Sequence, residues 1–167
     1  MKAASGNVLM LCYGNQGRLD DGLGAAFAAK MRERAPVGVT LELDYLLTVE
    51  HASDIAEHQV VIFVDAAVTG PEPFSFRSVT PVKVESFSTH LIEPGSVLEL
   101  AYELFGAKTP GYSLGIRGYE FDNFGEKLSP QAERNLNAAV EFTLELLNSG
   151  EFEAAVDREA RIETSEA

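Results

Sequence analysis

The fold of this chain is decided by residues 8–24, which read VLMLCYGNQGRLDDGLG. An apolar run comes first, a glycine-rich turn follows it, and apolar residues then recur at helical spacing from Leu23. A short apolar run bounded by turn residues is typical of a strand that is buried on both faces. The stretch therefore predicts a strand, a turn and a helix, which is the opening unit of an α/β domain.

Similar apolar runs recur along the chain. They predict four buried strands of a parallel sheet covered by helices, at residues 7–13, 39–44, 60–65 and 112–116. Residues 83–87 are β-branched and aromatic at intervals, and are a candidate for a further strand. The pattern of residues 74–80 is ambiguous.

Amphipathic helices are predicted between the strands. Three segments place their apolar residues on one face: Leu23, Ala26, Phe27 and Met31; Val97, Ala101, Leu104 and Phe105; and Leu136, Val140, Thr143, Leu144 and Leu147. Pro94 and Gly106 suit the two ends of one helix, and Ser129-Pro130 and Gly150 bracket the last one. A weaker helix is expected at residues 51–57. The alternation predicts an α/β sandwich with right-handed crossovers.

The length of 167 residues fits one domain. We expect residues 1–150 to form this single α/β domain. Residues 151–167 lose the helical period and become rich in charge, so we expect a disordered tail there.

Charge and cysteine content exclude several classes of protein. The formal net charge of -13 opposes binding to nucleic acid or to an anionic membrane. Cys12 is the single cysteine, so a disulfide within the chain is impossible, and its apolar neighbours favour a small buried hydrophobe over a reactive thiol. The sequence shows neither a signal peptide nor a membrane span, so we expect a cytoplasmic protein.

Polar residues that follow the strands are the candidates for chemistry, because ligands of such folds bind beyond the carboxyl ends of the strands. Asp20 and Asp21 stand in the first turn, where a phosphate would otherwise sit, and this argues against a nucleotide site. One of them is expected to cap the following helix, with Asp20 favoured for this role and Asp21 left for chemistry. Asp65 follows the third strand and either caps a turn or faces a cleft.

Histidines complete the candidate set. His90 precedes the helix that begins near Pro94, and taken alone it is more often a structural residue. His51 and His58 lie in a polar helical stretch and are expected to face solvent. Two carboxylates and one imidazole at strand ends would suit zinc, nickel or another divalent first-row ion, with coordination positions left open.

These residues resemble the signature of the hydrogenase maturation endopeptidases. The resemblance covers about residues 8–147, and it rests on the turn Gly14–Gly24, on Asp65 and on Ser88-Thr89-His90. It implies a three-layer α/β sandwich of phosphorylase/hydrolase-like type, with a twisted, mostly parallel sheet flanked by helices. It also implies an enzyme that trims the C-terminal extension of a nickel–iron hydrogenase large-subunit precursor and uses the inserted nickel as its recognition handle.

The resemblance also assigns roles to residues. It implies metal binding by Asp21, Asp65 and His90, catalysis by Asp21 and Asp65, and substrate contacts by Gly14, Asn15, Gly22 and Asp44. The small residues Gly22 and Gly24 would let the helix start lie close to the substrate. Nickel is expected to arrive with the substrate, and zinc or cadmium would substitute for it in crystals. Two departures from the family pattern are Gln16, where many members have proline, and Asp21, where glutamate is frequent.

The mechanism and two rival functions stay open at this point. A water molecule attacking a metal-polarised carbonyl, with Asp21 or Asp65 as the base, fits the principles of metal catalysis. A peptidyl-tRNA hydrolase would share the Gly-Asn turn, but the acidic charge argues against a tRNA substrate. A non-catalytic nickel-binding chaperone of the precursor would use the same ligands. The expected partner is the precursor protein, and nothing in the sequence requires more than a monomer.

Overall fold

The computed structural model describes residues 7–83 and 92–156. These residues form a five-stranded sheet with the order β2-β1-β3-β5-β4. The strands are β1 (Val8–Tyr13), β2 (Val39–Asp44), β3 (Val60–Ala67), β4 (Phe74–Val79) and β5 (Gly111–Arg117). Neighbouring strands are parallel except β4, which pairs antiparallel with β5. The carboxyl ends of β1, β2, β3 and β5 therefore meet at one edge of the sheet.

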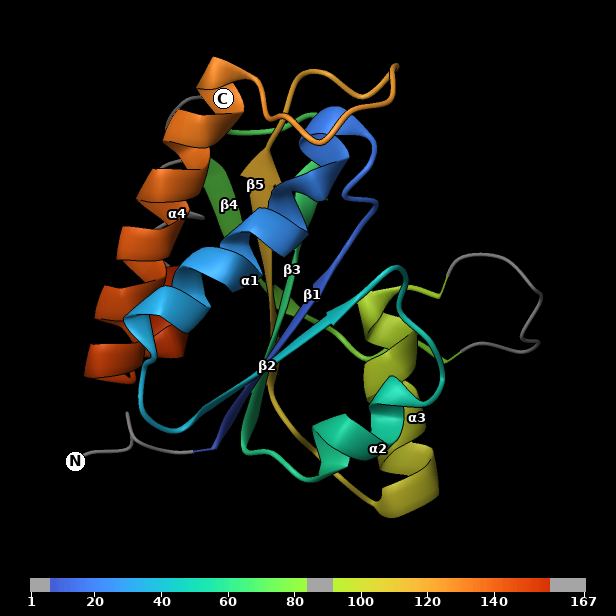
Figure 1. Ribbon diagram of the computed structural model, residues 1–167. Coiled ribbons are helices and arrows are strands. Elements are labelled where there is room, and N and C mark those ends of the chain that lie inside the picture. The colour runs from blue at the N-terminus through green and yellow to red at the C-terminus, as the bar shows by residue number, and fades with distance from the viewer. Residues whose placement is uncertain (1–6, 84–91, 157–167) are drawn as a thin grey trace.

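Helices cover both faces of the sheet (Figure 1). One face carries α1 (Leu23–Arg34) and α4 (Pro130–Ser149), and the other carries α2 (His51–Ala56) and α3 (Pro94–Phe105). A short 3-10 turn, η2 (Leu19–Gly22), leads into α1. The predicted three-layer α/β sandwich with a mostly parallel sheet is confirmed.

The predicted helix ends are confirmed. The side chain of Ser129 accepts a hydrogen bond of 3.2 Å from the backbone N–H of Ala132 and so caps the first turn of α4. Gly106 and Gly150 end α3 and α4 with φ values of 70° and 73°. This left-handed conformation favours glycine at the end of a helix.

The central strands supply two apolar cores because their side chains alternate between the faces. Val8, Met10 and Cys12 pack towards α1 and α4. Leu9 and Leu11 pack towards α2 and α3. Cys12 is 1% exposed, and burial raises the pKa of its thiol to about 12. The interpretation of Cys12 as a small buried hydrophobe is confirmed.

The two edge strands show where the sequence pattern was insufficient. Residues 39–44 were predicted to be buried on both faces, but β2 forms an edge of the sheet and is only half-buried. The ambiguous residues 74–80 contain the other edge strand, in which Phe74 and Phe76 face the core and alternate with more exposed residues. An edge strand has one neighbour, so its apolar content is a poor guide to how deeply it is buried.

Two further expectations need correction. Leu104 and Phe105 in the last turn of α3 are 63% and 55% exposed, although the helical spacing grouped them with the buried Val97 and Ala101. Periodicity identifies an apolar face but cannot tell how far along the helix that face is covered. The other predicted strand, at residues 83–87, lies outside the described residues except for Lys83.

The chain continues in ordered structure past Gly150. Residues 152–156 are helical, Ala155 is buried, and the ring of Phe152 stacks on that of Tyr112 with 5.6 Å between centroids. The expected disorder from Glu151 onwards is therefore wrong for this segment, because Phe152, Ala155 and Val156 pack on the core and the hydroxyl of Tyr112 donates a hydrogen bond to Glu153.

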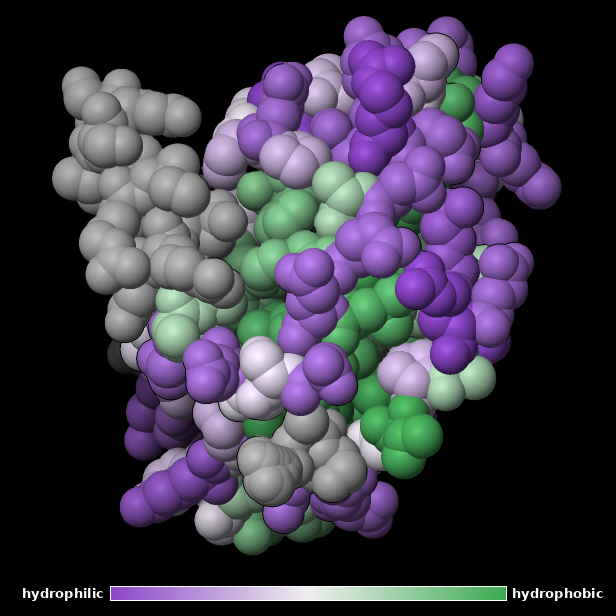
Figure 2. Space-filling view, turned by 90° about the vertical axis from the view of Figure 1, so that its left-hand side faces the viewer, coloured by the Kyte–Doolittle hydropathy of each residue, from purple (hydrophilic) through white to green (hydrophobic). Residues whose placement is uncertain are grey.

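The side of the molecule on which α4 lies is partly apolar. Figure 2 shows apolar residues there in a band between hydrophilic ones. An aromatic contact joins α4 to the edge strand β4, since the ring centroids of Phe74 in β4 and Phe142 in α4 lie 4.7 Å apart. No helix within residues 7–83 and 92–156 is long and apolar enough to cross a membrane.

Candidate functional site

The turn after β1 is shaped by Gly14. Its φ is +134°, a conformation that favours glycine. A Cβ atom at this position would collide with the backbone oxygen of Asp21 and would lie 3.5 Å from Oδ1 of Asp65. The missing side chain thus lets the turn fold back on the strand end, and it brings the predicted residues Asp21 and Asp65 to the same place.

Asp21 is held by the backbone of the turn. Its Oδ2 accepts a hydrogen bond of 2.9 Å from the N–H of Asn15. The side chain of Asn15 accepts a hydrogen bond of 2.8 Å from the N–H of Gly17 and so stiffens the same turn. The role of Asn15 in this geometry is to fix the carboxylate.

Asp65 lies within β3 near its carboxyl end and is partly buried. The pKa of its carboxyl is raised to about 7, chiefly by burial and in part by the negative charge of Asp21, while the hydrogen bond from the N–H of Ala66 lowers it. That hydrogen bond, to Oδ1, is 2.7 Å long. A carboxyl group with a pKa near neutrality can accept and release a proton at physiological pH, which suits a general base or acid.

The free oxygens of the two carboxylates are the type of donor that a hard or borderline divalent cation binds. Among the described residues, Oδ1 of Asp21 and Oδ2 of Asp65 accept no hydrogen bond, so each carboxylate keeps an oxygen for a ligand. A cation would also relieve the repulsion that raises the pKa of Asp65. No cluster of three or more His, Cys, Asp or Glu side chains that could hold a metal occurs within residues 7–83 and 92–156, and His90 lies outside these residues.

Tyr13 is a neighbour of the pair that the sequence analysis missed. Burial raises the pKa of its phenol above the ordinary value, and the charges of Asp65 and Glu93 raise it further. The phenol therefore stays protonated beside Asp65. Nothing in the sequence distinguishes this tyrosine from an ordinary apolar residue of a buried strand.

The adjacent Asp20 has a structural role that differs from the predicted one. It is fully buried, and its carboxylate accepts hydrogen bonds from the N–H groups of Tyr119, Glu120 and Ser129 and from the hydroxyl of Ser129. Burial opposes ionisation, but these bonds prevail and lower the pKa of Asp20. The helix α1 has no side-chain cap. Asp20 thus ties the turn to the start of α4 instead of capping the helix next to it.

A cavity of about 430 Å³ is lined by Gly14 and Asn15, which lie next to Asp21 and Asp65, although the two aspartates themselves are not among its lining residues. Its walls come from the first turn, the end of β2 and a later loop: Gly14, Asn15, Gln16, Gly17, Leu43, Asp44, Tyr45 and Glu126. Asp44, a predicted substrate contact, thus lines this cavity. Glu126 was not predicted from the sequence. It reaches this cavity because its neighbour Gly125 forms backbone hydrogen bonds of 2.8 Å with Gly17 and with Leu19, which precede it by more than a hundred residues in the sequence.

Gly22 and Gly24, which the resemblance places close to the substrate, are packed tightly against the protein. A Cβ atom on Gly24 would collide with the backbone of Tyr13, so this glycine lets α1 pack on β1. A Cβ atom on Gly22 would lie 3.2 Å from Cα of Gln16. Both positions need a small residue for packing within the protein.

His51, at the start of α2, and His58, just after its end, do not simply face solvent. The side chain of His51 is only 5% exposed, and Nδ1 accepts a hydrogen bond of 2.9 Å from the N–H of Thr48. His58 is half-buried, with Nε2 3.1 Å from the hydroxyl of Thr40. Polar residues flank these histidines in the sequence, so the sequence alone did not indicate that other segments of the fold would bury them.

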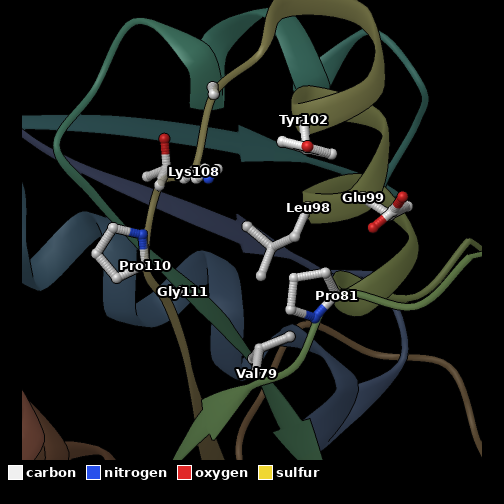
Figure 3. A pocket seen from close by; sticks show the side chains of 10 residues that line it. Val79, Pro81, Leu98, Glu99, Tyr102, Lys108, Pro110 and Gly111 are labelled. Carbon is white, nitrogen blue, oxygen red and sulfur yellow. The ribbon is translucent and has the colours of Figure 1, made fainter.

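Another cavity, of about 290 Å³, lies at the amino end of β5, away from the two carboxylates (Figure 3). Leu98 and Tyr102 of α3 and Val79 of β4 form much of its apolar wall, and its charged side chains are Glu99 and Lys108. It offers no pair of groups suited to acid–base chemistry.

Comparison with known proteins places this geometry on a known fold. No protein-family model matches the sequence, and no curated protein matches it either. Solved structures do match. The hydrogenase maturating endopeptidase HybD from E. coli superposes with a TM-score of 0.66 at 20% sequence identity, over 87% of this chain and 94% of that one.

Two structures from Thermococcus kodakarensis are similar as well. The NiFe hydrogenase maturation protease HybD gives a TM-score of 0.64 at 21% identity, over 84% of this chain and 99% of that one. The maturation protease HycI gives 0.63 at 23% identity, over 85% and 92%. This chain has the fold of these proteases along nearly their whole length.

Proposed function

We propose that this chain is a hydrogenase maturation endopeptidase, which removes the C-terminal extension of a nickel–iron hydrogenase large-subunit precursor after nickel insertion. The observation that carries the proposal is the pair Asp21 and Asp65, held around Gly14 at the carboxyl ends of β1 and β3. Support comes from the fold, which is that of structures named as hydrogenase maturation proteases.

The two carboxylates would divide the chemistry. Asp65 can take a proton from an attacking water near neutral pH, because burial and the charge of Asp21 raise its pKa to about 7. Asp21 is fixed by Asn15 and would stay a ligand or an electrostatic partner. The cavity beside them, with Asp44 on its wall, would receive the precursor near its cleavage site.

Nickel enters this reaction as part of the substrate. The pair supplies oxygen donors with open positions, and His90 would add a nitrogen donor, a set that suits a borderline divalent ion. Such a sparse set is completed only when the precursor brings ligands of its own. The proposal places this reaction in the cytoplasm, with a single copy of the chain as the acting unit.

The competing function is a chaperone that holds the nickel-bearing precursor without cutting it. The enzyme is favoured because the solved structures that share this fold are named as proteases or endopeptidases. Incubating the purified protein with nickel-loaded precursor decides between the two. The proposal expects a shortened large subunit and a released peptide in mass spectra, whereas a stable complex with an intact precursor would support the chaperone.

A further inference from the structure

His51 is a deeply buried polar group beside the candidate substrate cavity that the proposed mechanism leaves unused. Its side chain is 5% exposed, while that of Asp44, its neighbour, is 54% exposed. The Nε2 atom of His51 lies 3.3 Å from Oδ2 of Asp44. A buried ring thus stands directly behind an exposed carboxylate that lines the cavity.

The tautomer of His51 follows from its other contact. The N–H of Thr48 donates to Nδ1 over 2.9 Å, so Nδ1 must carry a lone pair. In the neutral ring the proton is then on Nε2, which faces Asp44. The backbone of the 45–49 segment therefore sets the ring so that it offers a donor to the carboxylate.

Asp44 is held from two sides. Oδ1 accepts a hydrogen bond of 3.0 Å from the N–H of Tyr45, and Oδ2 has His51 beside it. An exposed aspartate without such partners would exchange between rotamers and would lose this freedom only on binding. The hydrogen bond to Oδ1 and the imidazole beside Oδ2 together restrict the directions that this carboxylate can take on the cavity wall.

We propose that His51 is a positioning residue, which orients Asp44 for binding the precursor in the adjoining cavity. This inference rests on the proposed function, since it assumes that the cavity receives the precursor. It predicts an effect on substrate affinity, seen in KM, with little effect on the chemical step, seen in kcat.

Two substitutions separate positioning from a purely structural role. In His51→Gln the amide can reach towards Asp44 as Nε2 does, but it no longer accepts from Thr48. In His51→Asn the amide oxygen replaces Nδ1 as the acceptor, and the donor to Asp44 is lost. Positioning predicts that His51→Asn raises KM by roughly 2- to 10-fold, as expected for one lost polar contact, and that His51→Gln keeps most of the affinity.

A double-substitution comparison ties the effect to Asp44. With Asp44→Asn already present, His51→Asn should raise KM no further. His58→Asn serves as the matched control, because His58 lies just beyond the far end of α2 and contacts Thr40 and the carbonyl of Asp54. Its KM should equal that of the unchanged protein. A larger loss in His51→Gln than in His51→Asn, or an undiminished effect beside Asp44→Asn, would overturn the proposal.

Nitrogen-15 NMR of the imidazole tests the geometry without any precursor. The neutral ring of His51 should show a protonated Nε2 and an unprotonated Nδ1. A protonated Nδ1 would overturn the proposal even if the variants failed to fold. Absence of cleavage by the unchanged protein, together with the expected tautomer, would instead count against the proposed function and leave the geometry intact.

Discussion

Asp20 binds Ser129 through both oxygens of its carboxylate: Oδ1 accepts from the backbone N–H over 2.8 Å and Oδ2 from the hydroxyl over 2.7 Å. This contact joins the first turn to the start of α4 across 109 residues of sequence. It also separates the roles of two adjacent aspartates. The carboxylate of Asp20 is fully hydrogen-bonded within the protein, whereas that of Asp21 lies at the candidate functional site beside Asp65.

The first prediction concerns Asp20→Asn. The amide would present N–H groups to donors and leave buried groups unpaired, so the free energy of unfolding should fall by about 2–4 kcal/mol at pH 7. Because folding lowers the pKa of Asp20, its stabilisation exists above the ordinary value of 3.8 and is lost as pH falls. Urea unfolding at pH 7 and at pH 3 measures this. An equal loss at both pH values would contradict the ionic role.

Gly14→Ala tests the geometry of the turn. The added Cβ would meet the backbone oxygen of Asp21 in a conformation that disfavours alanine, so we expect a loss of about 1–3 kcal/mol in stability. Gly70→Ala is the control, because Gly70 has a φ of +106° but no atom within 4 Å of its added Cβ. Thermal unfolding of both variants should show the larger loss for Gly14→Ala. Equal losses would mean that close approach to Asp21 is unimportant.

Asp65→Asn should stabilise the protein at high pH. Folding raises the pKa of Asp65 from 3.8 to about 7, so the folded state binds more protons and stability falls as pH rises between these values. The asparagine variant avoids that fall. At pH 8 its free energy of unfolding, measured with urea, should exceed that of the unchanged protein by about 2–4 kcal/mol, whereas at pH 4 the two should be similar. The same dependence on pH in both proteins would argue against the raised pKa.

How far the sequence predicts this molecule depends on the range of the contacts involved. Apolar runs and helix-end residues such as Ser129 and Gly150 act over a few residues, so the elements and the fold class could be predicted. Gly14 and Asp21 belong to the same turn, and their proximity was equally accessible. Glu126 and the cover over His51 depend on contacts between distant segments, which no local pattern encodes.

Metal retention provides a test of the donor set. Oxygen-rich ligands without thiolates bind borderline ions weakly, so we expect the purified protein to be largely metal-free after dialysis against a chelator. Elemental analysis before and after dialysis measures this. Nickel or zinc retained at one ion per chain would instead indicate a permanent metal centre.

Cleavage by the proposed endopeptidase should depend on the nickel that the precursor carries. One enzyme preparation is mixed with nickel-loaded and with nickel-free precursor, and shortening of the large subunit is followed by mass spectrometry, with Asp21→Asn and His90→Ala as folded controls. The account predicts that only the nickel-loaded precursor is cut and that neither variant cuts it. Equal cutting of both precursors, or full activity in either variant, would contradict it.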